Sequence, residues 1–190
     1  PLPAGILGHW AAKVRKPTSS IPLTYEEIVD NHFFFNPKKW ALRYAPRLFW
    51  RSLRKIRTRG NSLTVGLLKG CVDTGIEIRT NTPAKRLLMT NGSISGIEIA
   101  IDGDLVEVQV TKGVVLASGG FEWDQEMMNQ YFPGPVEWTA SPSSNTGDGQ
   151  KMALEVGAHL DRMDQALIMG TTPVYYEGKV QGQPAADYFL

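Results

Sequence analysis

The sequence predicts an α/β fold in which an antiparallel β-meander leads into a buried strand of a parallel, doubly covered sheet. Two hairpin dipeptides, Asn91-Gly92 and Asp102-Gly103, separate three runs that have the composition of β-strands. A continuous apolar run, residues 114–117, follows the third strand and stops at Ser118-Gly119-Gly120. Helical patterns stand before and after this block. These observations together place the chain in the α/β class.

The first part of the chain has two helix starts. Residues 1–23 contain Pro, Gly and Ser without periodicity, so we expect an irregular connection there. Thr24 and Glu27 have the spacing of a capping box, which predicts a helix that begins at this point. A second helix is expected at Asn36-Pro37, with Asn36 as the cap and Pro37 at the first helical position.

Residues 38–59 are basic, with nine Lys and Arg residues and no acidic one. Arg43, Arg47 and Arg51 share one helical face, where like charges repel. An anionic neighbour would relieve this repulsion: a membrane surface, nucleic acid, or carboxylates in a part of the protein outside this chain. The favoured interpretation is a solvated face with the aromatic residues in the core. A nucleic-acid partner is not expected, peripheral membrane contact stays open, and Pro46 is expected to interrupt the helix.

The remaining elements are predicted from periodicity and turn residues. A helix over residues 60–75 ends at Gly75. Strands are expected over residues 76–79, 84–89, 94–101, 105–110 and 114–117. Further on we expect helices over 123–131 and 150–156, a short strand over 159–163, and loops over 171–190.

Composition sets broad limits on the class of protein. The 190 residues are 42% hydrophobic and 21% charged, as in ordinary globular domains. The net charge of +1 says nothing about a charged partner. A single cysteine, Cys71, excludes an internal disulfide and agrees with a reducing compartment, so we expect a cytoplasmic protein and a small core role for Cys71. Because the chain begins at Pro1 rather than Met, we expect a fragment of a longer protein.

Catalytic and metal motifs are sparse. The sequence has no GxGxxG, no P-loop, no GxSxG and no Cys/His cluster with metal-ligand spacing. Three scattered histidines are expected to be structural: His9, His32 and His159. Asp161 and Asp164 favour a surface or capping role over paired catalytic carboxylates.

Two glycine-containing loops are the strongest candidates for a binding site. Glycines at the end of a strand, Gly119 and Gly120, leave backbone N–H groups free and remove the Cβ that would block a phosphate or ribose. In Gly147-Asp148-Gly149, a carboxylate lies beside the N–H donors of a helix N-terminus and can hold sugar or ribityl hydroxyls. The alternatives are a tight turn at Gly119-Gly120 and a simple N-cap at Asp148.

The order of these segments resembles a known family. The stretches "GIEIRTNTPAKRLL", "GSISGIEI", "VTKGVVLASGGFEWDQEMM" and "NTGDGQKMALEVGAHLDRMDQA" are similar to the FAD-dependent oxidoreductases of the fumarate reductase and succinate dehydrogenase flavoprotein family. The 3-ketosteroid 1-dehydrogenase branch is the nearest within it. The preceding "RGNSLTVGLLKGCVDTG" fits the helix that the family places before this block. The resemblance covers about residues 59–170, and the family's N-terminal FAD fingerprint is absent from this chain.

The resemblance implies a cofactor site and a division of the chain. FAD would be contacted by Ala84 at the adenine ring, by Ala117, Ser118, Gly119 and Gly120 along the adenosine–pyrophosphate, and by Gly147 and Asp148 toward the ribityl chain and isoalloxazine. Residues 59–166 would be part of a Rossmann-like FAD-binding domain of the glutathione-reductase type. Residues 1–58 would be a helical segment on the substrate side, and residues 167–190 would start a substrate-capping α+β domain.

The resemblance also implies an activity. Such enzymes transfer a hydride to flavin from one carbon of a saturated C–C bond beside a ketone. A base, expected to be a tyrosinate, takes a proton from the other carbon. The expected substrate is a lipophilic ketone such as a 3-ketosteroid; the electron acceptor and the catalytic residues are not predicted. One alternative is a fumarate reductase-like enzyme for another unsaturated acid or ketone, although no His or Arg follows Arg162 to bind a dicarboxylate. The other is a non-catalytic module without cofactor.

Overall fold

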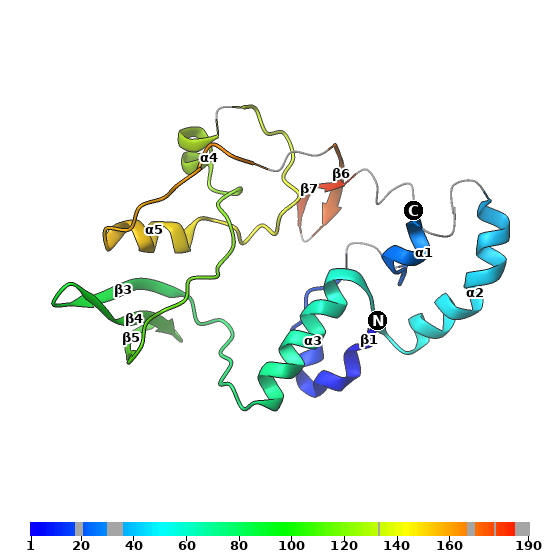
Figure 1. Ribbon diagram of the computed structural model, residues 1–190, viewed down its shortest axis with the longest axis horizontal. Helices are drawn as coiled ribbons and strands as arrows, with labels where there is room; N and C mark the ends of the chain where they lie inside the picture. Colours follow the sequence, from blue (N-terminus) through cyan, green and yellow to red (C-terminus); the bar gives the residue numbers. More distant parts are fainter. Residues whose placement is uncertain (18–20, 30–35, 133, 167–169, 177, 185–190) are drawn as a thin grey trace. The chain divides into compact units, whose positions relative to one another are not determined.

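The chain divides into two compact units, Pro1–Ile78 and Arg79–Pro184 (Figure 1). A computed structural model describes residues 1–17, 21–29, 36–132, 134–166, 170–176 and 178–184. His32, which was expected to be structural, and residues 167–169 lie outside the described residues. Each unit has helices and strands, in agreement with the mixed fold class that the sequence predicts.

The irregular connection expected over residues 1–23 is wrong for residues 2–12, which form regular elements, and agrees with the described residues 13–17 and 21–23. Leu2–Pro3 (β1) pairs antiparallel with Ile56–Arg57 (β2), and Ala4–Ala12 form a 3-10 helix (η1). This helix packs against α3, Arg59–Asp73, where Ala4, Leu7 and Val65 are buried. The apolar contact with α3 orders a segment whose Pro and Gly content suggested a loop. α3 ends as predicted at Gly75, which has a φ of 72°.

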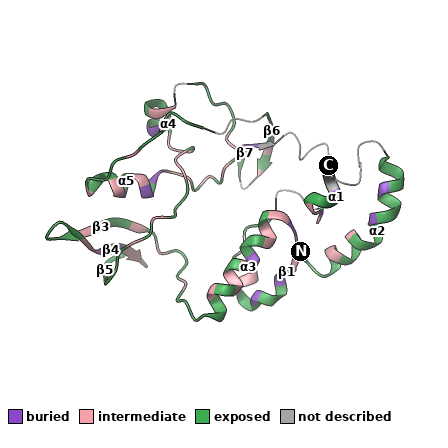
Figure 2. Ribbon diagram, in the orientation of Figure 1, coloured by how far each residue is buried: buried purple, intermediate pink, exposed green. Residues whose placement is uncertain are grey.

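A second cluster of the first unit joins α1, Tyr25–Val29, to α2, Pro37–Leu53. The capping box is confirmed, since the Thr24 N–H donates to Glu27 Oε2 (3.0 Å) and the Glu27 N–H donates to Thr24 Oγ1 (3.3 Å). Trp40 and Tyr44 of α2 pack with Leu23, and Trp40 Nε1 donates to the Glu27 carbonyl oxygen (3.0 Å). Figure 2 shows that most of α2 is nevertheless exposed.

Two expectations for α2 are corrected by these contacts. The predicted interruption at Pro46 is wrong, because α2 continues through Pro46 to Leu53. Packing of Tyr44 before the proline and ion pairs after it hold both halves in one helix. The anion that faces the arginines is Glu27 of this chain: Arg51 Nη1 donates to Oε2 (2.6 Å) and Arg47 Nη1 to Oε1 (3.2 Å).

The β-meander of the second unit is confirmed. Its strands Ala84–Thr90 (β3), Ser93–Ile101 (β4) and Asp104–Gln109 (β5) pair antiparallel in the order β3-β4-β5. The hairpins turn at the predicted dipeptides, where Asn91, Gly92, Asp102 and Gly103 all have positive φ. A two-point ion pair joins β3 to β4: Arg86 Nε lies 3.1 Å from Glu98 Oε1 and Nη2 lies 2.9 Å from Oε2.

Two helices and a hairpin complete the second unit. Gln125–Tyr131 (α4) starts at Asp124, whose Oδ1 accepts from the Met127 N–H (2.7 Å), and Asp148–Glu155 (α5) packs against β3. The loop expected over residues 171–190 is partly wrong, because Thr171–Tyr176 (β6) and Lys179–Pro184 (β7) form an antiparallel hairpin. In a two-stranded sheet both strands are edges, where the prolines Pro173 and Pro184 are tolerated.

Three predicted strands are wrong, namely those over residues 76–79, 114–117 and 159–163. A strand forms only where a second strand satisfies its backbone groups, and no described segment pairs with any of the three. The expected burial of residues 114–117 is also absent in this chain: the Val115 side chain is 90% exposed.

Candidate functional site

The two loops predicted to bind a cofactor lie against each other. We call residues 118–120 the glycine bend and residues 146–149 the TGDG loop. The Gly147 N–H donates to the Gly120 carbonyl oxygen (3.1 Å), and the Gly149 N–H donates to Ser118 Oγ (3.1 Å). Five of the predicted residues, Ser118, Gly119, Gly120, Gly147 and Asp148, are therefore in one place, and Ala117 directly precedes them.

The absence of side chains lets the loops approach so closely. A Cβ on Gly119, whose φ is 92°, would lie 2.5 Å from Asn145 Oδ1, and a Cβ on Gly120 would lie 2.6 Å from Glu122 Oε2. Asn145 and Glu122 are themselves joined by a 3.0 Å hydrogen bond from Nδ2 to Oε2. The glycines thus have a role in packing within the chain, which is the tight-turn alternative; contact with a cofactor is a separate role that stays a prediction.

The helix N-terminus at the TGDG loop differs from the simple-cap alternative. Gly147, with a φ of 73°, occupies the cap position, and Asp148 is the first residue of α5. The Asp148 carboxylate is exposed and accepts a hydrogen bond from Thr146 Oγ1 (3.1 Å). A carboxylate in the first turn is stabilised by the helix dipole and leaves further lone pairs for an external donor.

Polar groups around the bend are left without partners. Among the described residues, the backbone N–H groups of Ser118, Gly119 and Gly120 donate to no acceptor. Gln150 Nε2 donates to the Gly119 carbonyl oxygen (3.1 Å), whereas the buried Oε1 of the same side chain accepts no hydrogen bond. The bend therefore offers N–H donors and one buried acceptor, the combination that phosphate and hydroxyl groups satisfy.

An ion pair fixes the helix behind the TGDG loop. Lys151 Nζ of α5 lies 2.5 Å from Asp124 Oδ2, the residue that caps α4. The hydrogen bond from Lys151, and after it the bond from the Met127 N–H, holds the pKa of Asp124 below its ordinary value. The same pair raises the pKa of Lys151. Both groups therefore stay charged at neutral pH. Their ion pair joins α5, which the TGDG loop precedes, to the start of α4, which follows the glycine bend.

Ala84 is also a predicted site residue, but no hydrogen bond among the described residues joins it to the two loops. It is half-buried at the start of β3, where it pairs with Ile99. Its strand packs against α5, which carries the TGDG loop. Sequence reasoning included Asn145 in the second loop without giving it a role, and it missed Glu122 and Gln150. The contacts of these side chains join segments far apart in sequence and carry no local signal.

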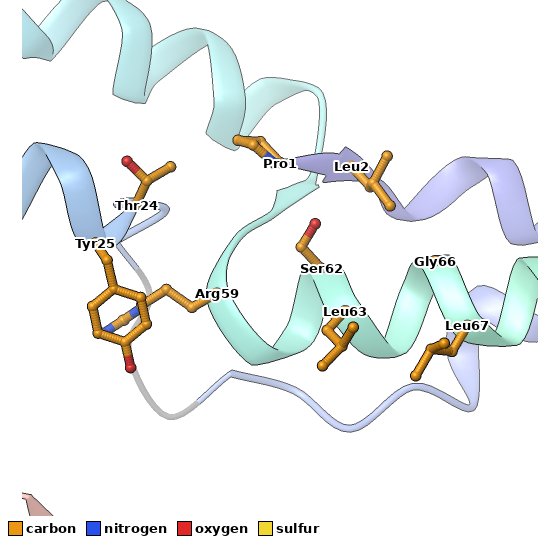
Figure 3. A pocket seen from close by; sticks show the side chains of 9 residues that line it. All are labelled: Pro1, Leu2, Thr24, Tyr25, Arg59, Ser62, Leu63, Gly66 and Leu67. Atoms are coloured by element: carbon orange, nitrogen blue, oxygen red, sulfur yellow. The ribbon is translucent and has the colours of Figure 1, made fainter.

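A separate pocket lies in the first unit and contains none of the predicted site residues (Figure 3). It measures about 480 Å³ and is lined mainly by apolar groups of β1 and α3, together with Tyr25 and Arg59. Leu63 and Leu67 project from the same side of α3 (Figure 3) and remain more than half exposed. No group of three potential metal ligands is present among the described residues.

Comparison with known proteins identifies the family. The FAD binding domain family matches residues 7–180. The 3-oxosteroid 1-dehydrogenase of Mycobacterium tuberculosis (strain ATCC 25618 / H37Rv) is 32% identical over 143 residues, 70% of this chain and 25% of that protein. The NADH:fumarate oxidoreductase of Klebsiella pneumoniae (strain 342) is 31% identical over 114 residues, 59% of this chain and 12% of that protein.

A solved structure agrees with these relatives. The 3-ketosteroid delta1-dehydrogenase from Sterolibacterium denitrificans, crystallised in complex with 1,4-androstadiene-3,17-dione, matches with a TM-score of 0.79 and 28% identity over 95% of this chain and 36% of that one. This chain thus spans between a quarter and about a third of the length of these two dehydrogenases. Because the family match covers nearly the whole chain, the resemblance predicted from the sequence is confirmed, and the protein belongs to the FAD binding domain family.

Proposed function

We propose that the glycine bend and the TGDG loop hold FAD in a flavin-dependent oxidoreductase. The observation that carries this proposal is that the N–H groups of Ser118, Gly119 and Gly120, which donate to no acceptor within the described residues, lie in a bend that is hydrogen-bonded to the N-terminus of α5. Backbone N–H groups and a helix N-terminus are the usual protein donors to phosphate oxygens. Ala117 to Gly120 would contact the adenosine–pyrophosphate, and the Ala84 backbone would contact the adenine.

The remaining polar groups fit the sugar-like part of the cofactor. Exposed Asp148 would accept hydrogen bonds from ribityl hydroxyls, and the buried Oε1 of Gln150 would accept one more. The small residues of the bend leave room for backbone approach, since no side chain larger than that of Ser118 projects from residues 117–120. The residues present therefore fit FAD.

The proposed substrate of the full-length protein is a 3-ketosteroid. Support comes from the names of the M. tuberculosis and S. denitrificans relatives and from the androstadienedione in the latter structure. The chemistry that FAD would supply when bound is acceptance of a hydride from one carbon beside a ketone. With loss of a proton from the adjacent carbon, the C–C single bond becomes a C=C bond. We assign no catalytic base to the described residues.

A second candidate is reduction of an unsaturated acid, which the Klebsiella relative favours. The experiment that separates the two is an assay of the purified full-length protein with an artificial electron carrier, once with a 3-ketosteroid and once with fumarate. Steroid oxidation supports the first candidate and fumarate reduction the second. A full-length protein without flavin absorbance would overturn both and favour the non-catalytic alternative.

The domain assignments remain part of the proposal. We propose that residues 59–166 contribute to a Rossmann-like FAD-binding domain and that residues 167–190 begin a capping domain. Support for the first is the family match over residues 7–180. Residues 1–58 are proposed as a substrate-side segment that also contacts a membrane peripherally through residues 38–59.

A further inference from the structure

Helix α2 has an apolar stripe on the side that faces away from its packed residues. Trp40 and Tyr44 are buried against Leu23. On the opposite side, large apolar side chains are 53% to 83% exposed and recur at helical spacing; these are Leu42, Phe49, Trp50 and Leu53, here called the outer stripe. Four such residues on one side of a helix expose more apolar surface than single residues scattered over a protein.

The charges beside the outer stripe are all positive. Lys38, Lys39, Arg43 and Arg54 are exposed and form no ion pair with a carboxylate of the described residues. The Arg54 guanidinium lies over the Trp50 ring, 4.4 Å from its centroid. Arg47 and Arg51 point to Glu27 instead, so the compensated charge lies on the packed side and the uncompensated charge flanks the stripe.

We propose that α2 lies in the interface of an anionic lipid membrane, with the outer stripe among the upper acyl chains and the flanking cations at the lipid phosphates. A helix with an apolar face, an aromatic residue and basic flanks binds in this way, by apolar burial together with attraction to anionic headgroups. Nucleic acid would pair the cations but leave Leu42 and Leu53 in water. Among the described residues, no helix has the length and hydropathy of a membrane span.

The stripe is also continuous, which an interfacial helix requires. α2 runs unbroken through Pro46, so residues before and after the proline present the same side. The Glu27 contacts hold this orientation from the packed side, because Arg47 and Arg51 are fixed there. This inference rests on the peripheral membrane contact proposed above for residues 38–59, which it assigns to one side of α2, and it does not depend on bound flavin.

The test is flotation of the full-length protein with vesicles of phosphatidylcholine alone and of phosphatidylcholine with phosphatidylglycerol. We expect binding to the anionic vesicles at low salt that weakens as salt rises. The double variant Leu42→Ser/Leu53→Ser should bind about tenfold or more weakly, because two apolar side chains leave the acyl region. Lys38→Ala/Lys39→Ala should lose about tenfold on anionic vesicles and little on neutral ones.

The matched control is Leu63→Ser/Leu67→Ser on α3, where the leucines are 64% and 63% exposed. It makes the same chemical change outside the stripe and should leave vesicle binding within about twofold. Equal losses in the two leucine pairs would overturn the proposal, as would the absence of vesicle binding. Binding of a DNA duplex that depends on Lys38 and Lys39, without vesicle binding, would assign the surface to nucleic acid. Lowered thermal stability of the Leu42/Leu53 variant without vesicle binding would assign it to contact within the polypeptide.

Discussion

Substitution of Gly119 by alanine separates the packing role of the glycine bend from its proposed cofactor role. The new Cβ would lie 2.5 Å from Asn145 Oδ1 at a φ of 92°. A left-handed conformation costs a residue with a Cβ about 1–2 kcal/mol, and displacing the Asn145–Glu122 hydrogen bond adds about 0.5–1.5 kcal/mol. We therefore expect Gly119→Ala to lower the free energy of unfolding by about 1.5–3.5 kcal/mol.

The control for backbone strain is Gly157→Ala. Gly157 has a similar φ of 84°, and its Cβ would meet no atom within 4 Å. This variant should lose only the strain energy and keep wild-type FAD affinity. If the bend binds FAD, Gly119→Ala should lower the affinity at least about tenfold, because the N–H donors move with the bend. Urea unfolding gives the stability, and fluorescence titration of the deflavinated full-length protein gives the affinity.

The double variant Gly119→Ala/Asn145→Ala tests whether the close contact with Asn145 causes both losses. Removal of the Asn145 side chain relieves this contact and lets the bend return, so stability and FAD affinity should both recover in part. Unchanged FAD binding in Gly119→Ala, together with its lowered stability, would refute the cofactor role of the bend and leave only its packing role.

Two further predictions concern acidic residues. Burial raises the pKa of Glu27, but hydrogen bonds from Arg51, Thr24 and Arg47 outweigh it and hold the pKa below the ordinary 4.5. The stabilisation by Glu27 is therefore present above about pH 4.5 and is lost as the pH falls through the lower folded-state pKa. Glu27→Gln should cost about 2–3 kcal/mol in urea unfolding at neutral pH and flatten this acid dependence; an unchanged acid profile would contradict it. Asp148→Asn should weaken FAD binding about tenfold in the same titration, whereas Asp161→Asn, at a carboxylate 82% exposed, should not; equal effects would exclude a specific role for Asp148.

Two local signals in the sequence, the capping box and the hairpin dipeptides, predicted the local structure correctly. Thr24 and Glu27 lie three residues apart and form the capping box from their own side chains. The hairpin dipeptides need only a positive φ, which Gly92 and Gly103 adopt easily. These features depend on a few adjacent residues, so no knowledge of the distant chain was needed.

Contacts between distant segments could not be predicted in this way. The pairing of Glu27 with Arg51 joins two helices, and the bond from Gly149 to Ser118 joins residues that are 31 positions apart. Residues 114–117 have the composition of a buried strand, yet Val115 is exposed because no described strand pairs with this segment. The composition of a segment indicates that it can form a strand, but the strand forms only where a second strand pairs with it.

The two loops proposed to hold the cofactor were singled out because their signal is partly local. Glycines after an apolar run and a Gly-Asp-Gly before a helix are visible in the sequence, and the structure brings both together through Gly120 and Gly147. The details that support a ligand are not visible there, namely the unpaired N–H groups and the buried Oε1 of Gln150. These depend on how the loops pack, as do the Asn145 and Glu122 contacts.

A crystal structure of the flavin-loaded full-length protein tests the central claim most directly. The account predicts that oxygen atoms of FAD accept hydrogen bonds from N–H groups at residues 118–120 and that a cofactor hydroxyl donates to Asp148. A flavin bound elsewhere, with that turn facing only water or other parts of the polypeptide, would contradict it.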